Sequence, residues 1–253
     1  MYSNAIVEEC KARRDAIQGK RPFSDSFTLG QIKDFYRIPM VWSSNAIEGN
    51  TLTEDETAII LTDGVTVGNH TLGELFEAIG GGKAYDFMFT LLESNTISKE
   101  DVLHFHELVA FSQPDLHPGR LRDVDVVITG LDESLPSCKD IPALFDGFVS
   151  WLACPHETED VVAFAAEAHA RLVSIHPFRD GNGRVSRLVM NTILLQHGYL
   201  PVAIPPVLRH NYITALRSYR LGKGRLDNFI DFIAKSELRT QKDFMRLLRI
   251  PFC

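Results

Sequence analysis

Twelve consecutive residues, from His176 to Arg187, hold the group of side chains best suited to chemistry in this sequence. The segment follows an alanine-rich apolar stretch and leads into residues with helical spacing, so it should open directly into a helix. Free backbone N–H groups at the start of a helix attract anions. The segment therefore predicts a site for a phosphate-bearing ligand.

The centre of the segment is the run Gly181, Asn182 and Gly183. The glycines let the chain turn with positive φ and let a ligand approach the backbone closely, and asparagine tolerates the left-handed region. The run therefore predicts a phosphate cradle. Taken alone, a G-N-G turn is also a common connector between helices.

The charged and basic side chains around this run suit phosphoryl chemistry. Arg184 and Arg187 are three residues apart and share a helix face, so their planar heads can contact successive phosphates. Asp180 offers a hard oxygen ligand for Mg²⁺, which is usually held by one or two carboxylates and substrate phosphates. His176 could take a proton from a hydroxyl that attacks phosphorus. A single histidine after such a helix is more often structural, but the combination favours a catalytic site.

The segment resembles, position for position, the signature H-x-F-x-[D/E]-G-N-G-R-x-x-R of the Fic domain family. The similarity extends from about Leu108, through His-Pro-Gly-Arg at 117–120, to about Ile233. It implies an all-α, Fic-type helical core with a short β-hairpin flap, in an enzyme that transfers AMP from ATP to a protein hydroxyl. The resemblance makes His176 the base and Asp180 the ligand of Mg²⁺.

The same resemblance assigns the remaining motif residues. It implies that Gly181, Asn182 and Gly183 form an anion hole and that the two arginines, Arg184 and Arg187, bind the outer phosphates of ATP. Relatives that transfer a phosphate or phosphocholine instead tend to depart from the glycine or arginine positions. This sequence keeps all of them, which favours adenylyl transfer.

A second short pattern lies upstream, from Ser44 to Gly49. On its own it predicts a short helix ended by glycine, with Glu48 where the helix dipole mildly disfavours a carboxylate. It resembles the inhibitory motif [S/T]-x-x-x-E-[G/N] of the family, which implies that Glu48 pairs with Arg187 and occupies the place of the γ-phosphate. A solvated glutamate is the simpler interpretation of the pattern in isolation, but its occurrence together with the full signature favours inhibition.

Two further assignments rest on the resemblance. Residues 124–130 alternate like a short strand followed by a turn, and the resemblance identifies them as the flap, which holds the target segment by strand addition. The flap residues are Val126, Val127, Ile128 and Thr129. A plain surface hairpin is the alternative. Tyr212 is implied to line the adenine pocket, although an aromatic residue at helical spacing more often belongs to a core.

Hydrophobic periodicity and capping residues predict the other elements: Thr53 and Glu56 should form a capping box, Gly64 should end that helix, and Ser98 should cap another. Helices are expected at 1–20, from Ile32 to near Pro39, and at 54–61, 72–92, 98–111, 141–152, 161–175, 184–196, 211–219 and 226–238. The glycine run at 80–82 is expected to be a helix break or a close helix crossing. The domain division that follows is 1–95 for an N-terminal helical region with the inhibitory motif, 96–238 for the Fic core and 239–253 for a short tail.

Composition limits the classes of function. A net charge of −7 over 253 residues argues against a dedicated nucleic-acid binder, because a polyanion would be repelled. The first 18 residues lack the apolar core of a signal peptide, and no run approaches the roughly 18 apolar residues of a membrane span. The four cysteines show no paired spacing. We therefore expect a cytoplasmic protein without membrane contact.

Three functions remain open at this level. The first is a protein adenylyltransferase that uses ATP and Mg²⁺, modifies a Ser, Thr or Tyr hydroxyl and is inhibited by Glu48. The second is removal of AMP, with Glu48 orienting a water molecule. The third is a nucleotide-sensing interaction module with little turnover, against which His176 and Asp180 speak. The target protein, self-modification and a homodimer are also left open.

Overall fold

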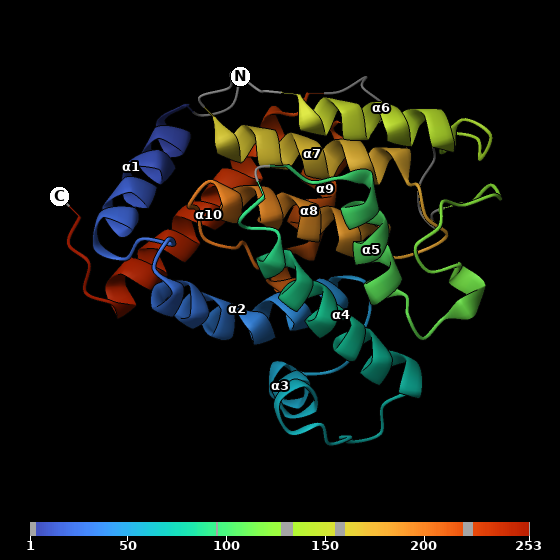
Figure 1. Cartoon of the computed structure of the whole chain (residues 1–253), viewed down its shortest axis with the longest axis horizontal. Helices are drawn as coiled ribbons and strands as arrows, with labels where there is room; N and C mark the ends of the chain where they lie inside the picture. The colour runs from blue at the N-terminus through green and yellow to red at the C-terminus, as the bar shows by residue number, and fades with distance from the viewer. Residues whose placement is uncertain (1–3, 95, 128–133, 155–159, 220–224, 253) are drawn as a thin grey trace.

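The computed structural model describes residues 4–94, 96–127, 134–154, 160–219 and 225–252, and this part of the chain is helical (Figure 1). The helices are α1 (Asn4–Lys20), α2 (Ser26–Ile47), α3 (Glu54–Asp63), α4 (Leu72–Thr90), α5 (Lys99–Val109), α6 (Ile141–Ala153), α7 (Val161–Ile175), α8 (Asn182–Gln196), α9 (Arg209–Arg217) and α10 (Asp227–Leu247), with 3-10 turns at Pro114–Leu116 and Pro206–Leu208. The predicted all-α class is confirmed for these residues.

Helix α8 lies at the centre of the fold. All of its residues are buried except Gly183 and Gln196, and a helix buried around its circumference must be covered on every side. Helix α7 packs along it, and α2, α4 and α5 also contact it. Figure 1 shows α8 enclosed by these neighbours. The motif residues at the start of α8 therefore belong to the most completely buried of the described helices.

Helix α2 runs unbroken through Pro39, so the prediction of a helix that ends near this residue is wrong. A proline inside a helix removes one hydrogen bond and costs about 3 kcal/mol. However, Ile32, Tyr36 and Ile47 are buried on either side of the proline, and burial of each such side chain contributes roughly 1.5–3 kcal/mol. The packing outweighs the defect, and the motif at residues 44–49 lies at the end of a long helix.

Helix α4 is continuous through its three consecutive glycines. The expected helix break is therefore absent, whereas the close helix crossing is present. A Cβ atom on Gly80 would lie 2.6 Å from the backbone oxygen of Leu108 in α5. A Cβ atom on Gly82 would lie 2.8 Å from Leu61 Cδ2 in α3. The glycines let neighbouring helices pack closely against α4.

The predicted helix caps are confirmed. Thr53 and Glu56 form a reciprocal capping box at the start of α3, and Gly64 ends this helix at φ 67°. Ser98 caps α5 by accepting a hydrogen bond from the N–H of Asp101. Such caps are each worth about 1 kcal/mol, and they can be read from the sequence because they depend only on local spacing.

The predicted β-hairpin flap is not supported. Described residues 124–127 and 134–137 form no strand, and Ile128 and Thr129 lie outside the described residues. Val127 is 96 % exposed, and Val126 is half-buried. A strand needs a neighbouring strand to satisfy its backbone groups, and the described part of the chain contains no sheet. The alternation of residue types was therefore not sufficient to predict a strand here.

The C-terminal helix is longer than expected, because α10 continues to Leu247 rather than ending near Leu238. It packs along α1 at one end of the molecule (Figure 1). Hydrogen bonds join them: Cys10 Sγ donates to Ala234 O at 3.3 Å, Gln241 Nε2 donates to Cys10 O at 3.0 Å, and Arg13 Nη1 donates to Met245 Sδ at 3.7 Å. None of the described helices has both the length and the apolar composition required to traverse a membrane.

Candidate active site

The loop between α7 and α8 begins with His176, whose backbone lies in the left-handed region at φ 53° and ψ 58°. Its N–H donates to Leu172 O at 3.1 Å and closes α7. A residue other than glycine is uncommon in this conformation and needs support from its surroundings. Nδ1 lies 3.3 Å from Val173 O. Because a carbonyl can only accept, the hydrogen is on Nδ1, and Nε2 is the nitrogen that can take up a proton.

Asn182 clamps this loop. The N–H of Phe178 donates to Asn182 Oδ1 at 2.9 Å, and Asn182 Nδ2 donates to Phe178 O at 2.9 Å. The Phe178 ring is fully buried and stacks on His106, with ring centroids 3.9 Å apart. Burial lowers the pKa of His106 to about 4, so this ring is neutral at neutral pH. The Asn182 side chain thus holds the loop, which leaves its backbone N–H for an anion.

Arg122 fastens the neighbouring chain segment to the same loop. Its backbone N–H donates to Pro177 O, and its Nε donates to His176 O, both at 2.8 Å. Its Nη1 donates to Val124 O at 3.0 Å. The side chain is buried, and its donors are used by backbone carbonyls. The segment that leads to the predicted flap is therefore tied directly to the predicted base.

Gly181 is the N-cap of α8, with φ 76° and ψ 0°. Its positive φ would strain any other L residue. The first helical hydrogen bond runs from Val185 N–H to Gly181 O at 3.0 Å. The N–H groups of residues 182–184 consequently lie before the helical hydrogen-bond ladder. Together with the helix dipole, they make this end of α8 suited to an anion, as expected of the predicted cradle.

Beside this cradle, Glu48 and Arg187 form an ion pair at 2.7 Å, although they are 139 residues apart. Arg187 also donates from Nε to Ser44 Oγ and from Nη2 to Ser44 O, both at 2.9 Å. A Cβ atom on Gly183 would overlap Glu48 Oε1, so the carboxylate lies directly against the start of α8. An anionic group bound to Arg187 Nη2 at this point would overlap the Glu48 carboxylate.

The protonation state of Arg187 follows from the same contacts. Burial disfavours the charged guanidinium, but the charge of Glu48 and the hydrogen bonds that Arg187 donates to Glu48 and Tyr212 outweigh it. The net effect raises the pKa of Arg187 above its ordinary value. The guanidinium is thus a fixed positive charge, and Glu48 is the carboxylate that balances it.

Arg184 is equally buried but differently surrounded. Its Nη2 lies 3.3 Å from Asp180 Oδ2, and its Nη1 lies 3.3 Å from Glu77 Oε1. The ion pair with Glu77 lacks hydrogen-bond geometry: within the described residues, Nε and Nη1 have no hydrogen-bond partner. Glu77 Oε2 accepts a 2.9 Å hydrogen bond from Asn50 Nδ2, two residues beyond Glu48.

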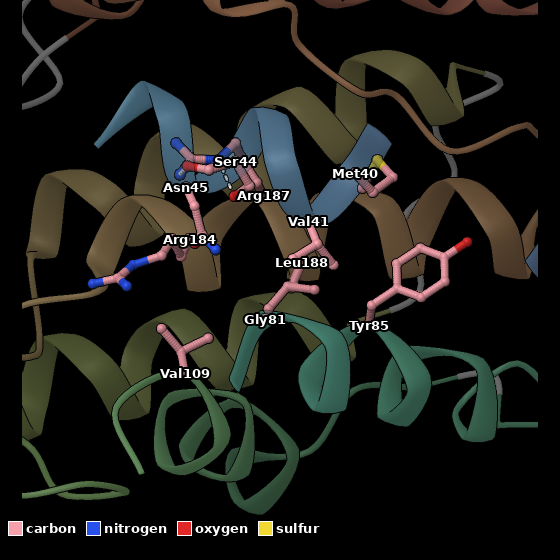
Figure 2. A pocket seen from close by; sticks show the side chains of 10 residues that line it. All are labelled: Met40, Val41, Ser44, Asn45, Gly81, Tyr85, Val109, Arg184, Arg187 and Leu188. Atoms are coloured by element: carbon pink, nitrogen blue, oxygen red, sulfur yellow. Dashed lines mark hydrogen bonds between the residues drawn. The ribbon is translucent and has the colours of Figure 1, made fainter. Parts of the chain in front are cut away.

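A small cavity of about 20 Å³ lies behind the two arginines (Figure 2). It is lined from α2, α4, α8 and the end of α5 by Met40, Val41, Ser44, Asn45, Gly81, Tyr85, Val109, Arg184, Arg187 and Leu188. This volume is enough for one water molecule. Asn45 Nδ2 is buried and has no hydrogen-bond partner in the described part of the chain, so a water here would satisfy it.

The carboxylate of Asp180 is the candidate metal ligand. Its side chain is 60 % exposed at the cradle, next to Arg184. The described residues include no group of three or more ligating side chains that could enclose a metal. Magnesium is commonly held by one or two carboxylates together with the phosphates of a substrate. The donor set fits a cation shared with a phosphate ligand.

Tyr212, in α9, is only 2 % exposed and lies beneath Arg187. Its Oη accepts from Arg187 Nη1 at 3.3 Å and lies 2.9 Å from His169 Nε2. The residue is part of the core, as its helical spacing suggested, and it is also in contact with a motif arginine. Its role in an adenine pocket stays a prediction.

Four residues that surround the motif were missed by sequence reasoning: His106, His169, Glu77 and Arg122. His169 gave a usable signal, because it is a polar residue in an alanine-rich helix that was expected to be buried on all sides. Glu77 and Arg122 gave no such signal, since the motif residues that they contact lie more than fifty positions away in the chain. Their positions become visible only in the folded structure.

Comparison with known proteins supports both the motif and the fold. Residues 96–194 match the Fic domain profile of the Fic/DOC family. The chain is 34 % identical over 235 residues to "Protein adenylyltransferase Fic" of Nematostella vectensis, covering 89 % of this chain and 54 % of that protein. It is 32 % identical over 236 residues to the protein of the same name from Drosophila melanogaster, covering 92 % and 47 %.

A solved structure shows the same fold. Fic-1 (residues 134–508) from C. elegans superposes with a TM-score of 0.86 at 29 % identity, covering 96 % of this chain and 72 % of that one. The chain spans about half the length of the curated relatives it matches. The match to the family profile includes the whole of the segment from His176 to Arg187. By its sequence and its helical fold, this chain contains a Fic domain of the Fic/DOC family.

Proposed function

We propose that this protein transfers AMP from ATP to a Ser, Thr or Tyr hydroxyl of a target protein, and that Glu48 inhibits the transfer. Relatives that resemble most of the chain bear the name protein adenylyltransferase. The observation that carries the proposal is the pairing of Glu48 with Arg187 across the anion cradle. A protein that binds no anion there would not need to cover the cradle with a carboxylate.

The triphosphate of ATP would bind at the start of α8. The backbone N–H groups of residues 182–184 would contact phosphate oxygens, with Arg184 and Arg187 on the outer phosphates. Asp180 would hold Mg²⁺ together with those oxygens, and the metal would supply positive charge against the charge that develops during transfer. These assignments use groups that already lie around one helix end.

His176 would act as the general base. With hydrogen on Nδ1, its Nε2 can accept the proton of the target hydroxyl as that oxygen attacks the α-phosphorus. A bond forms between the hydroxyl oxygen and the α-phosphorus, and the bond from the α-phosphorus to the oxygen bridging the β-phosphate breaks. Pyrophosphate leaves, and the proton stays on His176. The cradle N–H groups stabilise the negative charge on the phosphate oxygens.

Inhibition follows from competition for one guanidinium. The Glu48 carboxylate is paired with Arg187 and lies against Gly183. An outer phosphate of ATP would have to bind at this same position. A carboxylate and a phosphate in the same place would repel each other and leave one charge uncompensated. ATP can then bind productively only after Glu48 has moved away from the start of α8.

The direct test is transfer of label from α-labelled ATP with Mg²⁺, both with the protein alone and in a cell lysate. We expect label on protein with Glu48→Gly, much less with the parent, and none with Glu48→Gly/His176→Ala. Label on the protein itself would identify self-modification. Equal labelling by the parent and Glu48→Gly would contradict inhibition by Glu48.

Removal of AMP is the second candidate, and one observation favours it. The Glu48 side chain is 39 % exposed although it is paired, so water can reach its carboxylate at the cradle. A carboxylate there can orient a water molecule toward a phosphorus atom. Loss of AMP from a premodified target that depends on Glu48 would support removal. ATP binding without either reaction, in the parent and in Glu48→Gly, would instead indicate a nucleotide-sensing module.

A further inference from the structure

Arg187 rests on a buried pair of side chains that the motif does not include. Tyr212 Oη lies 3.3 Å from Arg187 Nη1 and 2.9 Å from His169 Nε2. Tyr212 is 2 % exposed and His169 is fully buried. Phe229 packs against both rings, with centroids 5.0 Å from His169 and 6.0 Å from Tyr212. The pair therefore has little freedom to move.

The directions of the hydrogen bonds are fixed by chemistry. A guanidinium can only donate, so Tyr212 Oη must accept from Arg187. The hydroxyl hydrogen is then available to His169 Nε2, which accepts it. Burial, and secondarily the charge of Arg187, holds the pKa of His169 well below its usual value, so the ring is neutral. Burial likewise raises the pKa of Tyr212. Both members of the pair are uncharged.

Neutral acceptors can fix an arginine without cancelling its charge. Besides Glu48, the hydrogen-bond acceptors of the Arg187 side chain within the described residues are Ser44 Oγ, Ser44 O and Tyr212 Oη, and none of them is charged. When Glu48 leaves, these three acceptors can keep the guanidinium in place, and its full positive charge faces the cradle. A carboxylate in place of Tyr212 would hold the arginine equally well but would compete with phosphate.

From this geometry we propose that Tyr212 and His169 are positioning residues for phosphate binding: His169 orients the Tyr212 hydroxyl, and the hydroxyl holds Arg187 against the outer phosphates of ATP. The inference rests on the proposed function in that it assigns the anion at Arg187 to ATP. Neither side chain touches the nucleotide phosphates in this account. Their effect is transmitted through the guanidinium.

The test compares ATP with AMP, because AMP lacks the outer phosphates. In the Glu48→Gly background, Tyr212→Phe removes only the hydroxyl, and we expect it to weaken ATP binding roughly tenfold, as for loss of one hydrogen bond to a charged group. AMP binding should be unchanged. In transfer assays, the change should appear in KM for ATP more than in kcat. Calorimetry with each nucleotide measures the affinities independently of turnover.

Variants of His169 provide the matched control. His169→Gln keeps an acceptor for the Tyr212 hydroxyl and should retain most of the ATP affinity of the Glu48→Gly protein. His169→Leu removes the acceptor and should behave like Tyr212→Phe. If Tyr212→Phe weakens ATP and AMP equally, or weakens neither, the positioning role is wrong. A proportional loss of both affinities with a lower melting temperature would indicate a merely structural role. Absence of transfer in Glu48→Gly would overturn the proposed function, yet the affinity comparison would still decide this inference.

Discussion

The two arginines of the motif lie one helical turn apart and are equally buried, but they are held in opposite ways. Arg187 is fixed by three hydrogen bonds to uncharged acceptors and by a 2.7 Å ion pair with Glu48. Arg184 has two carboxylates at 3.3 Å, Asp180 and Glu77, and two of its nitrogens lack hydrogen bonds among the described residues. Arg187 therefore has one charged partner and three uncharged ones, whereas Arg184 has two charged partners at longer range.

The two environments give Arg187 and Arg184 different responses to the loss of a neighbouring carboxylate. A tightly oriented arginine that depends on one carboxylate for charge balance has two clear states, paired with Glu48 or paired with a ligand. An arginine between two carboxylates at longer range changes less when either carboxylate is neutralised, because the other remains. Under the proposed inhibition, the effect of Glu48 on ATP binding through Arg187 should be close to all-or-none, whereas a carboxylate beside Arg184 should only adjust the affinity.

The largest expected effect comes from replacing each arginine with lysine in the Glu48→Gly background. Lysine carries a compact charge and cannot donate in the fixed directions that the Arg187 contacts require. We expect Arg187→Lys to lower kcat/KM for AMP transfer on the order of 100-fold, and Arg184→Lys about tenfold. Rates with α-labelled ATP, with melting temperatures as a control for folding, measure both. Equal losses would remove the distinction between the two arginines.

Some contacts of the two arginines can be predicted from the sequence, and others cannot. The motif residues are adjacent in sequence, so their arrangement at one helix start follows from local periodicity and glycine chemistry. The Glu48–Arg187 pair was expected from a resemblance, because no local pattern links residues 139 positions apart. Glu77 and His169 were not anticipated at all. Their contacts depend on how α4, α7 and α9 pack against α8, which residue spacing does not encode.

In the fold, too, features set by neighbouring residues could be predicted, whereas features set by packing between distant segments could not. The helix caps at Thr53 and Ser98 were predictable because capping depends on residues three apart. The continuity of α2 through Pro39 was not, since it results from burial of its apolar side chains against distant helices. The alternation around Val127 predicted a strand that the described residues do not form. Alternation indicates a strand reliably only where a sheet exists to receive it.

A smaller effect, on the pH dependence of stability, is expected at Glu237, a buried ionisable group that lacks, among the described residues, the counter-charge that Arg187 has. Glu237 in α10 is fully buried, and its Oε1 accepts from the N–H of Leu200 at 3.1 Å. Its Oε2 has no hydrogen-bond partner in the described part of the chain. Burial raises the pKa of Glu237 to about 8, so the group is largely protonated at neutral pH. Arg187, which has a counter-charge, remains charged.

The sign of the resulting pH dependence follows from the raised pKa. The folded protein holds the proton of Glu237 up to about pH 8, whereas the unfolded chain releases it near pH 4.3. The contribution to stability is therefore fully present below about pH 4.3 and is lost as the pH rises through 8. Nearby Cys10 and Tyr199 do not interfere in this window, because burial raises the pKa of both.

Glu237→Gln should remove this dependence. Relative to the parent, the variant should gain on the order of 5 °C in melting temperature between pH 5 and pH 8.5, with transfer activity unchanged. Thermal unfolding at a series of pH values measures the difference. Parallel melting curves for the two proteins across this range would show that Glu237 is not held neutral in the fold.

The claim that Glu48 and phosphate compete for Arg187 is tested most directly by calorimetric titration of ATP and AMP into the parent, Glu48→Gln and Glu77→Gln. Each variant removes one carboxylate charge next to one arginine and keeps the side-chain shape. We expect ATP affinity to rise at least about tenfold in Glu48→Gln and to change little in Glu77→Gln, because Asp180 remains beside Arg184. AMP affinity should be the same in all three proteins. Unchanged ATP affinity in Glu48→Gln, or an equal gain for AMP, would contradict the account.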